Sequence, residues 1–327
     1  MTAFVATRAE TQNGSGEARL IALDPGKMAR SFPAEPFAYR HFLAAHPLLQ
    51  LDALAQLAAG MPRDRLEYNS GRLKVDQKPE ETPGVDLEPT EIVRQIETAG
   101  AWMVLKNVET IPEYGRVVEA VLDEAARASG HRDRRSAGMT EPMGFIFVSS
   151  AHAVTPFHLD YEENLFVQLH GDKAMHVFDN RDRSIIDEEG LETFPGKHRN
   201  HRFRDHYASR EQVFAFKAGD GMFLPYTWPH WVETGDDWSI SMAITWKTPE
   251  GRRLNKLYFA NAVLRRLGIP QAPPGQRRWL DGVKVALYDI ARLPLEPLRR
   301  GEAMRRMLRT ALFGRAANYY YGKAGKT

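Results

Sequence analysis

The stretch TPFHLDYEENLFVQLHGDK, residues 155–173, decides the fold expected for this chain, because it sets charged residues inside an aromatic, apolar run. His158 precedes Asp160 by two positions, and Lys173 follows Asp160 by 13. Residues two apart in a β-strand point to one face, so a strand here would direct His158 and Asp160 at one point. A pair of this kind is common on ordinary strands, so a metal site requires a further ligand.

Short segments rich in β-branched and aromatic residues surround this stretch between residues 144 and 247. They read GFIFVS, NLFVQL, KAMHVF and QVFAFK, and the clearest is SISMAITW at 239–246, where apolar and small polar residues alternate. Such alternation is typical of strands that bury one face, and Gly-Asp turns separate several of the segments. The pattern predicts an antiparallel β-sandwich or barrel.

The further ligand is expected in GDGMFLPYTWPHWVETG, residues 219–235. A Gly-Asp turn leads into an apolar strand, and a bend between two prolines then presents His230. Antiparallel strands some 70 residues apart in sequence can place His230 beside His158. Two histidines and one carboxylate form the facial triad that binds Fe(II) and leaves coordination positions open. We therefore predict His158, Asp160 and His230 as metal ligands and catalytic residues.

Iron(II) in such a triad usually works with 2-oxoglutarate, whose far carboxylate needs a cation and a hydroxyl. The segment from Trp231 to Trp246 contains no Lys or Arg, so the last strand supplies no cation. Lys173 is the available candidate, and Thr155, three residues before His158, is the candidate hydroxyl. The competing interpretation of Lys173 is an edge lysine that keeps the sheet from pairing further.

Residues 144–246 resemble the JmjC branch of the cupin superfamily, and most of all the small JmjC hydroxylases similar to factor-inhibiting-HIF. The resemblance lies in TPFHLD, in the lysine of GDK and in GDGMFLPYTWPHWV. It implies a double-stranded β-helix with flanking helices, Fe(II) on the triad, and 2-oxoglutarate on Lys173 and Thr155 with Asn164 near its metal-bound end. It also implies a dioxygenase that uses O2 to hydroxylate its substrate.

Two other classes of protein stay open at this point. One is a non-catalytic or ligand-binding cupin, and the other is a cupin enzyme such as an isomerase or a dioxygenase without cosubstrate. The latter usually place more histidines on the metal, whereas no third histidine lies two residues from His158. The substrate is not identified by the sequence: a protein side chain, a small metabolite, a lipid or sugar, and RNA are the candidates.

The chain is expected to divide into four segments. Residues 1–35 are polar and rich in Gly and Pro, and are predicted to be loosely ordered. Residues 36–143 are predicted as a mixed helical and strand region that packs on the core, with helical segments over 37–60. Residues 144–248 form the β-helix core, and 249–327 a basic helical region. The histidines and arginines of 196–206 are expected in an exposed loop near the barrel mouth.

Composition limits compartment and partners. The 327 residues include no cysteine, no apolar run of membrane-spanning length and no secretory leader, so a cytoplasmic protein, at most peripheral to a membrane, is expected. Residues 250–327 hold 17 basic and 5 acidic side chains. Amphipathic helices are predicted at 250–269 and 301–315. A homodimer through C-terminal helices, which small JmjC hydroxylases often form, is the first expectation, an anionic membrane surface the second, and nucleic acid a less favoured third.

Overall fold

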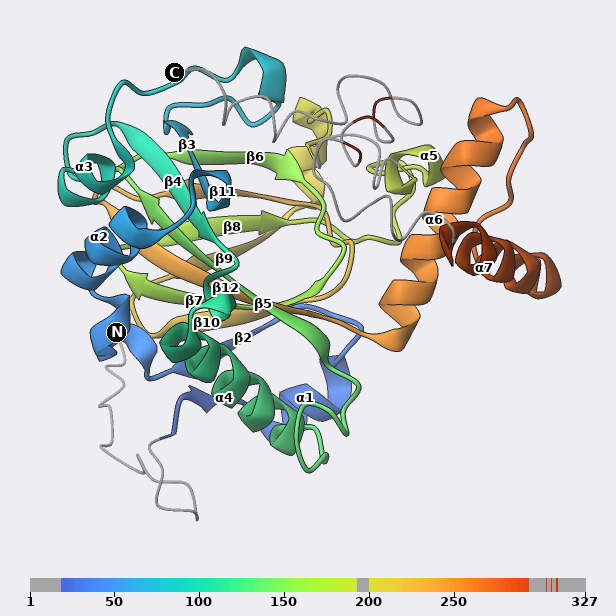
Figure 1. The fold of residues 1–327 in the computed structure, drawn as a ribbon, viewed down its shortest axis with the longest axis horizontal. Helices are drawn as coiled ribbons and strands as arrows, with labels where there is room; N and C mark the ends of the chain where they lie inside the picture. Colours follow the sequence, from blue (N-terminus) through green and yellow to red (C-terminus); the bar gives the residue numbers. More distant parts are fainter. Residues whose placement is uncertain (1–18, 193–199, 294–303, 305–306, 308–309, 311–327) are drawn as a thin grey trace.

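The computed structural model describes residues 19–192 and 200–293, together with Met304, Met307 and Thr310. Two antiparallel sheets face one another in this region (Figure 1). The larger has the order β1-β2-β10-β7-β12-β5-β4-β3, and the smaller has the order β6-β11-β8-β9. Core strands β5 to β8 alternate between the sheets, as do β9 to β12, while β8 and β9 are neighbours in the smaller sheet. This is the arrangement of the predicted double-stranded β-helix, and helices flank it. The predicted fold class is confirmed.

The strands and helices have the following bounds. The strands are β1 Ile21–Ala22, β2 Phe37–His41, β3 Leu66–Ser70, β4 Ala101–Lys106, β5 Thr140–Ser149, β6 Val154–His158, β7 Glu163–His170, β8 Lys173–Val177, β9 Gln212–Phe216, β10 Asp220–Leu224, β11 His230–Thr234 and β12 Ser239–Lys247. The helices are α1 Pro25–Ser31, α2 Leu51–Gly60, α3 Pro89–Arg94, α4 Pro112–Ala128, α5 Glu188–Leu191, α6 Pro249–Arg266 and α7 Arg278–Arg292.

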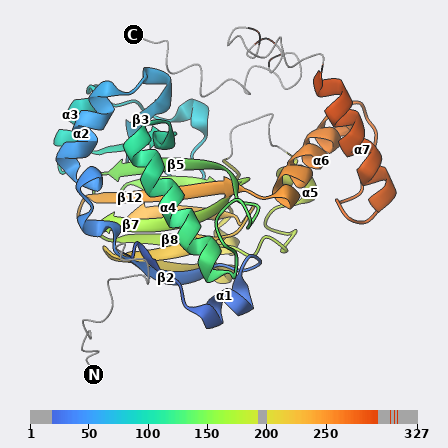
Figure 2. The same cartoon turned by 60° about the horizontal axis from the view of Figure 1, so that its bottom comes forward.

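Strand β12 shows how the two faces of the larger sheet differ. Ile240, Met242, Ile244 and Trp246 belong to the main hydrophobic core, which α2, α3 and α4 cover on the outside of the sheet; α4 crosses that face in Figure 2. The alternate residues Ser239, Ser241 and Thr245 are also buried. Their side chains face the smaller sheet, because strand residues alternate between faces. The space between the sheets is therefore lined by polar groups as well as apolar ones.

The N-terminal region departs from two predictions. Residues 37–41 were expected to be helical, but they form β2, which pairs with β10 and alternates buried and exposed residues. Phe37 and Tyr39 face the core and Arg40 faces solvent, a period of two that the helical interpretation overlooked. Residues 21–31, expected to be loosely ordered, contain β1 and α1. Strands β1–β4 extend the larger sheet beyond the predicted 144–248 core.

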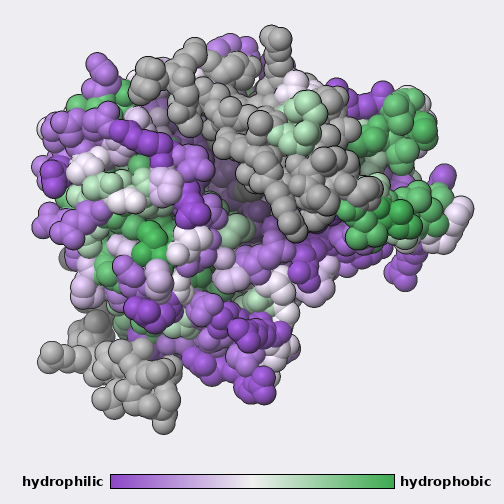
Figure 3. All heavy atoms as spheres, in the orientation of Figure 1, coloured by the Kyte–Doolittle hydropathy of each residue, from purple (hydrophilic) through white to green (hydrophobic). Residues whose placement is uncertain are grey.

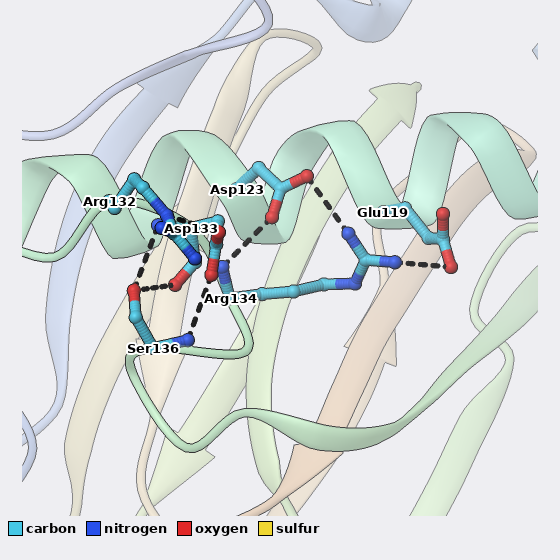
Figure 4. A network of polar contacts seen from close by, with 6 residues as sticks. All are labelled: Glu119, Asp123, Arg132, Asp133, Arg134 and Ser136. Atoms are coloured by element: carbon cyan, nitrogen blue, oxygen red, sulfur yellow. Dashed lines mark hydrogen bonds and ion pairs between the residues drawn. The ribbon is translucent and has the colours of Figure 1, made fainter.

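The loop that joins α4 to β5 is held by an ion-pair network on the α4 surface (Figure 4). The Arg134 guanidinium lies 2.5 Å from Glu119 and 2.9 Å from Asp123, and the Arg134 backbone N–H also donates to Asp123. Asp133 and Ser136 bond to one another within the turn. The network fixes where β5 begins, and β5 in turn pairs with β12 over most of its length.

The C-terminal region contains the two helices α6 and α7, which pack on one another and stand away from the sheets in Figures 1 and 2. Helix α6 begins at the cap residue Thr248, whose hydroxyl accepts from the Gly251 N–H. Its predicted apolar side is partly confirmed, since Leu257, Tyr258 and Asn261 are buried. The predicted helix at 301–315 falls mostly outside the described residues. None of the helices described has the length and apolar character needed to cross a bilayer.

Candidate metal centre and ligand pocket

His158 and His230 form a cross-strand pair between β6 and β11, with ring centroids 4.1 Å apart. The Nδ1 atom of His158 lies 2.7 Å from the Pro156 carbonyl oxygen, and Nδ1 of His230 lies 2.9 Å from that of Trp228. A carbonyl oxygen only accepts, so Nδ1 carries the proton in both rings and the lone pair is on Nε2. This is the tautomer that a metal ligand needs.

Asp160 completes the group from just beyond the end of β6. Its Oδ2 atom lies 3.8 Å from His158 Nε2 and 3.7 Å from His230 Nε2. One ligand atom from each of the three side chains lies within 4.8 Å of the others. Two imidazole nitrogens and one carboxylate oxygen on one side of a point fit a divalent metal with open positions opposite. The predicted triad is thus brought together, although Asp160 does not lie within the strand.

Burial favours the neutral imidazole that metal binding requires. The His230 side chain is almost fully buried, and the pKa of His230 is lowered to about 4 by burial first and by the neighbouring His158 second, against an opposing contribution from Asp160. His158 and Asp160 are slightly more accessible, with side-chain exposures of 16% and 22%. The triad is therefore closed on the β11 side and open on the β6 side.

A backbone hydrogen bond connects the bend before His230 to the Asp160 loop. Thr227 has a left-handed backbone with φ of 59°, which is costly for a β-branched residue. Its N–H donates to the Asp160 carbonyl oxygen at 2.8 Å, and its hydroxyl donates to the Tyr226 carbonyl at 2.8 Å. The strained turn links the segments that carry two of the three ligands, so their separation is set by the backbone.

Thr155 reaches the interior because the pairing of β6 with β11 contains a bulge. His230 pairs with His158 and Val232 pairs with Thr155, with a shift of register between them. Residues three apart in a regular strand point to opposite faces, but the extra residue returns Thr155 to the face of His158. The Trp102 indole N–H donates to Thr155 Oγ1 at 3.0 Å, so the Thr155 hydroxyl proton is left to donate elsewhere.

Lys173 points into the space between the sheets and is not an edge lysine. It pairs with Thr234 of β11, and its Nζ donates to Ser241 Oγ of β12 at 2.9 Å. The side chain is buried, and burial lowers the pKa of Lys173 to about 7. The turn before it requires glycine: Gly171 has φ of 69°, and a Cβ there would lie 2.1 Å from the Trp238 carbonyl oxygen.

Asn164 lies next to Thr245 as a cross-strand pair between β7 and β12. Both side chains are buried, and Asn164 Oδ1 and Thr245 Oγ1 have no hydrogen-bond partner among the residues that the structure describes. The same holds for Ser149 Oγ and Gln168 Oε1, deeper between the sheets. Buried polar atoms are normally paired, so this group points to a polar ligand in the interior. Of these residues, Asn164 alone was predicted.

A surface pocket of about 270 Å³ lies beside β8 and β9, and its lining includes none of the three triad residues. Val177, the cross-strand partner of His230, lines it together with Trp228, Gln212 and Arg210. The described part of the 196–206 loop lies on the other side of the triad, where Asn200 bridges to His158. Its expected place near the barrel mouth agrees with that bridge for residues 200–206, while residues 196–199 lie outside the described part.

The Cupin-like domain family matches residues 62–251, which is more than half of the chain. No curated protein matches. Among solved structures, the chain is similar to the Escherichia coli ribosomal oxygenase YcfD with cobalt and 2-oxoglutarate: 16% identity, 84% of this chain and 67% of that chain covered, TM-score 0.45. For YcfD with cobalt and succinic acid the sequence identity is 13%, the match covers 89% of this chain and 71% of that chain, and the TM-score is 0.42. The narrower likeness to factor-inhibiting-HIF stays a prediction.

Proposed function

The chain belongs to the family of cupin-like domains, and from that premise we propose that it is an Fe(II)- and 2-oxoglutarate-dependent oxygenase that hydroxylates its substrate. One observation carries the proposal. The triad of His158, Asp160 and His230 shares the interior of the sandwich with a buried lysine, Lys173, that faces the same space from β8. A metal site and a buried cation in one enclosed space suit a dicarboxylate that bridges them.

Each end of the cosubstrate has residues that suit it. Lys173 and Thr155 would hold the far carboxylate, the lysine by charge and the threonine by its hydroxyl proton. Ser241 positions the lysine ammonium from the opposite sheet. Asn164 and Thr245, with their unpartnered oxygens, would face the metal-bound end or the water that accompanies it. When bound, the iron and 2-oxoglutarate would supply oxidative chemistry with O2, in which succinate and carbon dioxide are formed.

The protein's own contribution is to orient the bound groups and to limit water. His158 and His230 are held as Nε2 donors by two backbone carbonyls, so no rearrangement of the rings is needed for binding. The almost completely buried His230 and the aromatic side chains around Trp228 exclude water on one side. The partly exposed side chains of His158 and Asp160 leave the triad accessible to a substrate from the β6 side. We leave the substrate open among a protein side chain, a metabolite, and a lipid or sugar.

The test begins with binding and ends with turnover. The purified chain is titrated anaerobically with Co(II) and then with 2-oxoglutarate, and binding is followed by calorimetry and by the visible spectrum of Co(II). We expect one metal per chain and metal-dependent binding of 2-oxoglutarate. Succinate is then measured in air with Fe(II) and ascorbate, and slow formation without substrate is expected. Failure of both metal and 2-oxoglutarate to bind would overturn the proposal.

The same experiment separates the competing classes. A ligand-binding cupin would bind a metal or an acid but form no succinate under any substrate mixture. A cupin enzyme without cosubstrate would bind metal and leave 2-oxoglutarate unbound. The matched control is His152→Ala, because His152 is exposed and lies outside the triad. It should bind metal and cosubstrate as the unaltered chain does.

A further inference from the structure

Tyr226 lies four residues before His230, in the bend that leads to this ligand, and three neighbouring segments hold it. Its backbone N–H donates to the Glu163 carboxylate of β7 at 2.9 Å. Its carbonyl oxygen accepts from the side-chain amide of Asn180, in the loop after β8, at 3.1 Å. Its hydroxyl donates to Asn255 Oδ1 of α6 at 2.7 Å. The bend is therefore connected to α6 as well as to the sandwich.

The same side chain of α6 also contacts the segment that carries the carboxylate ligand. Asn255 Nδ2 donates to the backbone carbonyl oxygen of Tyr161 at 3.4 Å, and Tyr161 directly follows Asp160. The rings of Tyr161 and Tyr226 pack edge to face with their centroids 6.0 Å apart. The Asn255 amide thus joins the tyrosine that follows Asp160 to the tyrosine in the bend before His230.

Helix α6 presents Asn255 from the half that lies against the sandwich. Leu254 packs against the apolar cluster that contains Tyr161. Gly251, about one turn before Asn255, lies beside the Tyr226 ring, since a Cβ added there would be 3.5 Å from Tyr226 Cδ2. Figure 3 shows the C-terminal helices projecting from the molecule, with hydrophobic side chains gathered over them. The contact with the bend therefore lies where these helices join the sandwich.

We propose that Asn255 is a positioning residue of the metal centre, which holds Asp160 and His230 at the separation that one metal ion requires. The inference rests on the proposed function, because it takes the triad as a metal site. Asp160 lies beyond the end of β6, so no strand pairing fixes it. The bond from the Thr227 N–H to the Asp160 carbonyl is one link, and the loop could turn about a single link. A second contact from α6 removes that freedom, and metal ligands need such support.

The competing interpretation is that Asn255 only attaches α6 to the rest of the chain. The helix has other attachments for that purpose. Arg265 pairs with the buried Glu192 at 2.6 Å, and Leu257 and Tyr258 are buried. Loss of the Asn255 amide should therefore leave α6 in place and act on the two segments that carry the ligands.

The first readout is made with Co(II) and the full chain. Asn255→Leu removes both hydrogen bonds and keeps a side chain of similar size. The Co(II) affinity should fall about three- to tenfold, as expected for the loss of one or two neutral hydrogen bonds, and the visible absorption bands of bound Co(II) should shift. Asn261→Leu is the matched control, because it removes a buried amide of α6 that is bonded to Lys284 of α7. Its Co(II) affinity and spectrum should equal those of the unaltered chain.

The second readout needs no metal. The Thr227 N–H donates to the Asp160 carbonyl, so its amide exchange reports the contact between the two segments. In Asn255→Leu this exchange should become several-fold faster, while the amides of β12 keep their rates. Tyr226→Phe removes the hydroxyl and keeps the ring, and should cause part of the same change. The double variant should be no worse than Asn255→Leu alone, because the two changes break the same bond.

The outcomes separate this inference from the proposed function. If the unaltered chain binds Co(II) and Asn255→Leu binds it with the same affinity and spectrum, Asn255 does not position the triad and the inference is overturned. Equal effects of Asn255→Leu and Asn261→Leu would overturn it as well, since α6 packing alone would then explain the change. No Co(II) binding by the unaltered chain would overturn the proposed function together with the inference.

Discussion

Lys173 and Ser241 lie on opposite sheets and are joined across the interior by a hydrogen bond of 2.9 Å from Lys173 Nζ to Ser241 Oγ. Ser241 is a neutral partner, so the bond orients the buried ammonium but does not neutralise its charge. Burial accordingly lowers the pKa of Lys173 to about 7. A bound carboxylate would reverse that shift, since an opposite charge nearby favours the protonated form. The lysine is thus suited to an anionic ligand.

Lys173→Met keeps the length of the side chain and removes its charge. A charge-assisted hydrogen bond contributes roughly 1.5–3 kcal/mol, so the affinity for 2-oxoglutarate should fall about 10–100-fold. Calorimetry with the Co(II)-loaded chain measures this loss, and the affinity for Co(II) itself should stay unchanged. Lys247→Met, which removes a surface lysine paired with Glu141, is the matched control. Equal affinity for 2-oxoglutarate in the unaltered and Lys173→Met chains would show that Lys173 does not bind the cosubstrate.

The affinity for 2-oxoglutarate should depend on pH through Lys173. Above pH 7 the free protein has a neutral lysine, whereas the complex holds a charged one, so binding takes up a proton. The dissociation constant should then rise by about tenfold per pH unit above 7. Titrations between pH 6.5 and 9 in buffers of different ionisation enthalpy measure both the slope and the proton uptake. Lys173→Arg keeps its charge over this range and should show a flat profile.

Asp160→Asn replaces the one anionic ligand by a neutral group of the same size. The metal affinity should fall by at least about 100-fold, more than the loss on changing a group that only supports a ligand. Thermal unfolding without metal should hardly change, because Asp160 is partly exposed. Equilibrium dialysis with Co(II) measures the affinity. Retention of stoichiometric metal in Asp160→Asn and in His230→Ala together would show that the ion binds elsewhere.

Trp102→Phe removes the indole N–H that donates to Thr155 Oγ1 and keeps a ring beside Phe147. The Thr155 hydroxyl then loses the contact that orients it. Loss of one neutral hydrogen bond amounts to roughly 1 kcal/mol, so 2-oxoglutarate affinity should fall by about fivefold. Metal affinity should not change, and the pH profile should keep the slope that Lys173 imposes. A drop in metal affinity instead would indicate a general disturbance of β6.

Gly171→Ala should destabilise the fold by more than Gly268→Ala. Both glycines have positive φ, 69° and 78°, but an alanine Cβ meets the Trp238 carbonyl only at position 171 and meets nothing within 4 Å at position 268. The backbone strain is about 1–2 kcal/mol at either site, and the clash adds to it at Gly171. Denaturant unfolding of both variants measures the difference. Equal losses would show that the turn before Lys173 relaxes freely.

The sequence predicted the residues of the site better than it predicted their surroundings. His158, Asp160 and His230 were recognisable because a pair at strand spacing and a histidine in a Gly-Asp and proline context are local patterns. The alternation in β12 was also visible, but it does not tell which of the two alternating sets of side chains faces the smaller sheet. Ser241 and Thr245 were therefore missed, since their role depends on residues of other strands.

Two other features had physical reasons to be missed. Residues 37–41 are short and lie next to helical segments, so the period of two in Phe37 and Tyr39 was outweighed by the alanines and leucines that follow. Helix α7 was not singled out, because an amphipathic pattern gives the same signal whichever side is buried. The contacts of Asp281 and Lys284, and the ring of Tyr288 against Phe259, show which side of α7 faces α6.

Strand β6 lies at the edge of the smaller sheet, with β11 as its only strand neighbour among the described residues. Its other side is held by backbone bonds from Val154 to Gly71 and from Phe157 to Val75. A metal bound by His158 of β6, by Asp160 and by His230 would link this edge strand to β11. Amide exchange in β6 should therefore slow on metal binding while that of β12 stays the same, so the opening of one strand would report whether the site is filled.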